Sequence, residues 1–158
     1  MAPLLRKSAK DALSTLCVSS CHFEIDSSML TPASTSNKIL VMVTANISAS
    51  EHIQAKLVRD STDLFIGDAS SNRTRASYNT FGRVGSGSDL GGTGYFGAVP
   101  MSVSYLDSPA TTSSTTYKIQ TNLNSGSWVA YVNRTAEDQD SGSFGRLASS
   151  ITAYEIAG

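Results

Sequence analysis

The feature that most constrains this chain is a two-residue alternation of apolar and polar side chains, which begins near residue 15 and recurs along the rest of the sequence. In the run 37–47 it places Ile39, Val41 and Val43 on one face. Successive side chains of a β-strand point to opposite faces, so this period is typical of strands and not of helices.

The same pattern predicts about eight strands separated by turn residues. Strands at this spacing, with no alternating helical segments between them, favour an antiparallel sandwich or barrel. We therefore expect an all-β fold with about eight antiparallel strands, a sandwich or a barrel, over residues 15–158. The expected strands are 17–25, 37–47, 53–57, 64–66, 99–105, 117–123, 128–132 and 149–156.

Composition excludes several classes of protein. The 158 residues suggest one domain, and the net charge is -1 with 12 basic and 13 acidic residues. This balance argues against a nucleic-acid binder and against a polybasic membrane anchor. No apolar run is long enough for a spanning helix. Only 16% of residues are charged, and 27 Ser and 15 Thr supply much of the polar surface instead.

Residues 1–14 form an N-terminal arm of different composition. Its first 13 residues fit either a short helix or a frayed terminus, since a helix of that length is marginal alone. Arg6, Lys7 and Lys10 stand where a signal peptide requires an apolar stretch, so we expect synthesis in a reducing cytosol without export through a signal sequence. Cys17 and Cys21, four apart in an expected strand, lie too far apart for a disulfide.

The sequence offers little catalytic chemistry. His22 and His52 are the only candidate bases for a nucleophilic triad, and no Gly-x-Ser-x-Gly elbow is present. The spacing of the cysteines and histidines does not match a zinc site, and the acidic run 137–140 lacks the ligand spacing of a calcium loop. We expect no enzyme activity, no metal and no cofactor.

Two long polar loops, residues 68–94 and 134–148, interrupt the strands. Loops of this length in a compact domain are usually functional or packed against a neighbour. The first contains Arg73, Arg75, Tyr78 and Phe81.

Four segments, taken together and in order, resemble small virion structural proteins of tailed bacteriophages, especially those of marine and cyanobacterial phages. The resemblance extends over about residues 24–158. Its segments are LTPASTSNKILV (30–41), YLDSPATT (105–112), TYKIQ (116–120) and SITAYEIAG (150–158).

The resemblance implies a trimeric jelly roll of the tumour-necrosis-factor shape, without catalytic residues, that serves as a capsid decoration protein, head fibre or fibre tip. We expect a capsid decoration or cement protein located in the virion, with the major capsid protein or other virion proteins as partners. The arm would dock on the particle through Leu4, Leu5, Arg6, Lys7 and Lys10.

Two alternatives stay open. In a receptor-binding fibre tip, the host contacts to a surface glycan or protein would come from Arg73, Arg75, Tyr78 and Phe81. A carbohydrate-binding module is the other alternative.

The alternation also predicts self-association. Several strands carry apolar residues on the face opposite the expected core, which calls for a second partner layer. We predict a homotrimer that uses this face. The residues concerned are Leu40, Met42, Val129, Tyr131, Tyr154 and Ile156.

Overall fold

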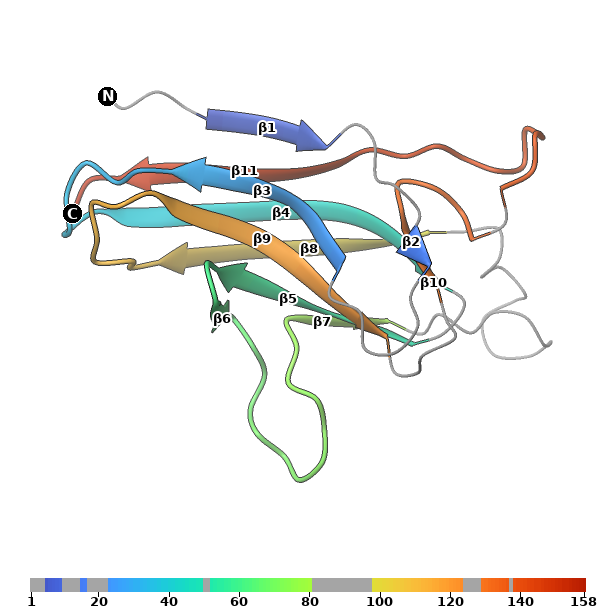
Figure 1. Cartoon of the computed structure of the whole chain (residues 1–158), viewed down its shortest axis with the longest axis horizontal. Helices are drawn as coiled ribbons and strands as arrows, with labels where there is room; N and C mark the ends of the chain where they lie inside the picture. Colours follow the sequence, from blue (N-terminus) through green and yellow to red (C-terminus); the bar gives the residue numbers. More distant parts are fainter. Residues whose placement is uncertain are drawn as a thin grey trace.

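The computed structural model describes residues 5–9, 15–16, 23–49, 52–80, 98–123, 129–136 and 138–158. These residues form two antiparallel sheets that pack face to face (Figure 1). They contain no helix, and hence none long and apolar enough to cross a membrane. The predicted all-β antiparallel sandwich is confirmed.

Sheet A has six strands, and its centre is β4. The order is β1-β11-β4-β10-β2. β8 lies off this path and pairs with β4 over residues 39–47 of β4. The bounds are β1 Leu5–Ala9, β2 Thr15–Leu16, β4 Lys38–Ala49, β8 Val99–Asp107, β10 Val129–Val132 and β11 Ser149–Ile156.

Sheet B has five strands in the order β3-β9-β5-β6, and β7 also pairs with β5. Its bounds are β3 Phe23–Leu30, β5 Ile53–Arg59, β6 Thr62–Leu64, β7 Tyr78–Thr80 and β9 Thr115–Leu123.

The core lies between the sheets where the alternation predicted it. In β4, Ile39, Val41 and Ala45 are fully buried. In β9 the inward residues Tyr117 and Ile119 are also fully buried, and the residues between them are partly exposed. Burial of one face of each sheet against the other provides the main driving force for this fold.

The helix considered for residues 1–13 is wrong where the structure describes this segment. Residues 5–9 form β1, which pairs antiparallel with β11 over its whole length, from Leu5↔Ala153 to Ala9↔Ser149. The edge of β11 provides hydrogen-bond partners for this backbone, whereas a helix this short is marginal alone. Residues 5–9 thus extend sheet A.

The strand expected at residues 64–66 also needs correction. β6 ends at Leu64, and Phe65 has a φ of 49°, which turns the chain out of the sheet. The strand expected over residues 17–25 is described only from Phe23, where β3 begins. Cys17 and Cys21 lie outside the described residues. β1, β2 and β7 were not expected as strands.

A buried ionic network joins the two sheets at one end of the sandwich. Arg59 of β5 donates through Nη1 to both carboxylate oxygens of Asp107 of β8, at 2.9 and 2.8 Å. Tyr117 of β9 donates its hydroxyl to Asp107 Oδ2 at 2.7 Å. Burial, followed by the hydrogen bond to Asp107, raises the pKa of Tyr117. The phenol is therefore a neutral donor, and the network is a structural link between the sheets.

Candidate interaction surface

The outer face of sheet A carries a partly exposed apolar row across three neighbouring strands. Tyr154 of β11, Leu40 of β4 and Leu106 of β8 lie opposite one another in register. Leu106 is 47% exposed, and Met42, one step further along the same face, is 47% exposed. Ile156 of β11 lies beside this row, opposite Lys38, and is also exposed.

Away from this row, the face continues with small hydroxyl side chains. The outward positions beside Met42 are Ser104 and Thr152, and the next register carries Thr44 between Ser102 and Ser150. Among the outward positions of β4, β8 and β11, the structure describes one charged residue, Lys38. We call the outward positions of these three strands the sheet A face.

The outer face of sheet B is different. It presents Lys56, Lys118 and Gln120, and Lys56 forms a 2.6 Å ion pair with Asp63. A charged face is suited to water, whereas loss of charge together with large apolar groups is typical of a buried interface core. The sheet A face therefore has the chemistry of a contact surface.

The structure groups four of the six residues predicted for self-association. Leu40, Met42, Tyr154 and Ile156 share the sheet A face. Val129 and Tyr131 are on β10, which pairs with the far end of β4. There the guanidinium of Arg134 stacks 4.1 Å from the centre of the Tyr131 ring.

Sequence reasoning missed two exposed apolar residues. Leu106 follows the alternating run 99–105, so its outward position was available from the period alone. Phe65 is 51% exposed and stacks against Tyr105 of β8, with ring centroids 5.6 Å apart. No local pattern indicated this contact between residues 40 positions apart.

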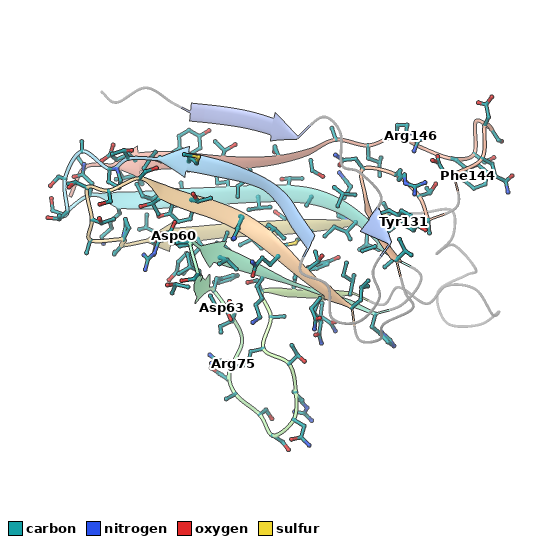
Figure 2. All side chains as sticks on the ribbon, in the orientation of Figure 1. Asp60, Asp63, Arg75, Tyr131, Phe144 and Arg146 are labelled. Atoms are coloured by element: carbon teal, nitrogen blue, oxygen red, sulfur yellow. The ribbon has the colours of Figure 1, made fainter. Side chains whose placement is uncertain are left out.

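The predicted host-contact residues separate into two places. Arg73 and Arg75 lie on the exposed loop between β6 and β7, which extends away from both sheets (Figures 1 and 2). Arg75 Nε donates to the Gly67 carbonyl at 2.6 Å, which braces the loop. Tyr78 lies on β7, packs against the core and donates its hydroxyl to the Pro100 carbonyl at 3.4 Å. Phe81 lies outside the described residues.

The loop 134–148 is fastened across its two arms by a single carboxylate. Asp138 accepts from Arg134 Nη1 at 2.7 Å and from Arg146 Nη2 at 2.6 Å. The hydrogen bond from Arg146, followed by the charges of both arginines, holds the pKa of Asp138 below its ordinary value. Figure 2 shows Tyr131, Phe144 and Arg146 at the opposite end of the sandwich from Asp60.

The base of this loop is tied to β4 and β11 through Asn133. Asn133 has a φ of 62°, and its backbone bonds to the Asn46 carbonyl and to the Leu147 amide. Its side-chain oxygen accepts from Ser149 Oγ, which in turn accepts from the Asn46 amide at 3.0 Å. Asn is favoured in this left-handed conformation, so the residue has a structural role at a sharp turn.

Of the predicted docking residues, Leu5, Arg6 and Lys7 lie on β1 at the edge of sheet A. Leu4 and Lys10 lie outside the described residues. β1 occupies one border of sheet A, and β8 borders β4 on the other side.

Within the described segments, no three His, Cys, Asp or Glu side chains gather where they could hold a metal ion. No protein-family model and no curated protein matches this sequence.

Proposed function

We propose that this chain is a non-enzymatic structural protein of a phage particle, a capsid decoration or cement protein that acts as a homotrimer. The observation that carries the proposal is the sheet A face, where Leu40, Leu106 and Tyr154 form an apolar row on a surface almost free of charge. The resemblance of the four sequence segments to phage virion proteins supports the class of particle.

The energetics of burial support a contact between the sheet A face and a second copy of the chain. Each buried large apolar side chain stabilises a complex by roughly 1.5–3 kcal/mol, and hydroxyl side chains are cheaper to bury than charges. A second copy of the chain is a partner that is always present at the same concentration. Light scattering on the purified protein at micromolar concentration is expected to give three times the 16.6 kDa of one chain. A stable monomer would contradict the proposed assembly.

Attachment to the particle is assigned to the arm. Leu5, Arg6 and Lys7 combine an apolar group with two positive charges on an edge strand, and the adjacent Leu4 and Lys10 have the same character. Such a segment fits a locally acidic protein surface, where partial desolvation strengthens charge pairing. The particle would carry the protein on its outside, after synthesis in the host cytoplasm.

The decisive experiment locates the protein in the particle. Quantitative mass spectrometry of purified phage is expected to find a copy number comparable to that of the major capsid protein, and antibody labelling is expected to mark the head. Absence from particles would contradict the proposal.

A few copies per particle, at a tail or fibre end, would favour a receptor-binding tip. One further observation supports this second candidate function. Residues 67–75 are all exposed on the protruding loop, and its backbone is held by Arg75 and by the Arg73 to Ser70 turn. A braced, exposed loop is suited to recognition. For a fibre tip, replacing Arg73 and Arg75 with serine is expected to reduce adsorption to host cells without changing the trimer.

A further inference from the structure

Phe65 combines exposure with an unfavourable backbone conformation. Leu64, the residue before it, is buried at the end of β6, and Phe65 itself is 51% exposed with a φ of 49°. Its ring lies against Tyr105 of β8, with an angle of 43° between the ring planes. The pair lies between the β6 edge of sheet B and the β8 edge of sheet A.

A bulky residue in the left-handed region is a genuine outlier, because glycine or asparagine adopts this conformation with less strain. Phe65 does not belong to the buried core that would compensate for the strain. Strained residues are typical of functional positions, and an exposed aromatic ring is typical of the centre of an interface. Strain together with exposure makes Phe65 a candidate contact for a partner.

A ring of three copies requires two different surfaces. Around a three-fold axis each contact is heterologous, so one patch of a copy meets a different patch of the next. The sheet A face is one such patch. The Phe65–Tyr105 pair provides an apolar group on a different side of the molecule.

The two patches also lie at the same level along the strands. Tyr105 is in register with Val41 of β4, between the outward residues Leu40 and Met42. A cyclic assembly has no translation along its axis. Rotation about an axis nearly parallel to β4 therefore brings the aromatic pair of one copy to the apolar row of the next copy. No displacement along that axis is needed.

We propose that Phe65, supported by Tyr105, packs on the sheet A face of a second copy, against Leu40, Met42 and Tyr154. This inference rests on the proposed homotrimer and specifies its contact. Its experiment distinguishes the two, because each side of the contact is changed separately.

The test uses Phe65→Asn and Met42→Glu in the full chain. Asparagine suits the left-handed backbone, so Phe65→Asn is expected to keep or raise the melting temperature of the monomer while weakening assembly at least a hundredfold in analytical ultracentrifugation. Met42→Glu is expected to weaken assembly similarly. Met29→Asn is the matched control, because Met29 is 50% exposed on β3 of sheet B, and it is expected to assemble as wild type does.

Mixing the two variants completes the test. Phe65→Asn keeps an intact sheet A face and Met42→Glu keeps an intact aromatic pair, so the mixture is expected to form 1:1 heterodimers that neither variant forms alone. If Met42→Glu dissociates but Phe65→Asn assembles normally, or if no heterodimer forms, this inference is overturned and the proposed trimer stands. A wild-type monomer overturns both.

Discussion

The Tyr117 hydroxyl donates a 2.7 Å hydrogen bond to Asp107 Oδ2, across the space between the two sheets. The same carboxylate receives two hydrogen bonds from Arg59, and its side chain is almost fully buried. Both partners of Asp107 come from sheet B, whereas Asp107 ends a strand of sheet A. One carboxylate therefore fixes the spacing of the sheets at the end where Phe65 and Tyr105 meet.

The first prediction concerns this carboxylate. Asp107→Ala leaves the Arg59 charge and the Tyr117 hydroxyl without their partner, and breaking a buried pair in this way costs about 3–5 kcal/mol. Urea denaturation is expected to show a loss of that size. The double variant Arg59→Met, Asp107→Leu removes both charges and is expected to recover a large part of it. A loss below about 1 kcal/mol in the single variant would place this pair with weak surface ion pairs.

A second prediction concerns acid stability near the C-terminal strand. Glu155 Oε1 accepts from the Asn37 side chain at 2.7 Å and from the Ala33 amide at 2.6 Å, and these bonds lower the pKa of Glu155. Because the folded state holds the carboxylate ionised, the stabilisation is present above the ordinary value of 4.5 and is lost as pH falls through the lower folded pKa.

Glu155→Gln is therefore expected to be less stable than wild type near pH 7, and the difference is expected to shrink by about pH 3. Urea titrations at the two pH values measure it. Asp68→Asn, on the exposed loop, serves as the control and is expected to leave the acid profile nearly unchanged. A stability difference between Glu155→Gln and wild type that grows as the pH falls would contradict this assignment.

A third prediction concerns the fastening of loop 134–148. Asp138→Asn weakens both ion pairs to Arg134 and Arg146, but exposed pairs contribute only about 0–1 kcal/mol, so the melting temperature is expected to change little. Trypsin is expected to cut this loop several times faster, because the arms separate more often. Asp140→Asn changes a neighbouring carboxylate for which the structure describes no ion pair, and its digestion rate is expected to match wild type. Equal rates in all three proteins would show that Asp138 does not fasten the loop.

Sequence periodicity predicted the parts of the fold that local alternation controls. The burial of Ile39 and Val41, and the inward direction of Tyr117, follow from a period of two and a hydrophobic core. The contacts that depend on tertiary structure did not follow. Arg59 and Asp107 are 48 residues apart, so nothing local indicates that they meet. Phe65 was expected to continue the strand of Leu64, because glycine or asparagine is the residue that usually indicates a left-handed backbone. An aromatic residue at this position gives no such indication.

The conformation of the N-terminal arm also depends on a tertiary contact. Its leucines and basic residues fit a helical period as well as an extended one, and the choice depends on β11, whose paired residues lie at least 140 positions further along the chain. The pairing of residues 5–9 with β11 determines the conformation of the segment, and no short-range pattern contains that information. Four of the six residues predicted for self-association nevertheless share the sheet A face, and the self-association itself stays a prediction.

The last prediction tests docking through β1 without removing the strand. Arg6→Glu with Lys7→Glu keeps the chain length and the backbone pairing with β11, so the protein is expected to stay folded. Reversing two charges against an acidic surface turns attraction into repulsion, so incorporation into particles is expected to fall at least tenfold. Lys56→Glu with Lys118→Glu makes the same change of charge on the outer face of sheet B and is expected to leave incorporation near the wild-type level. Full occupancy with the β1 variant would move the attachment site from the arm to the loops of the sandwich.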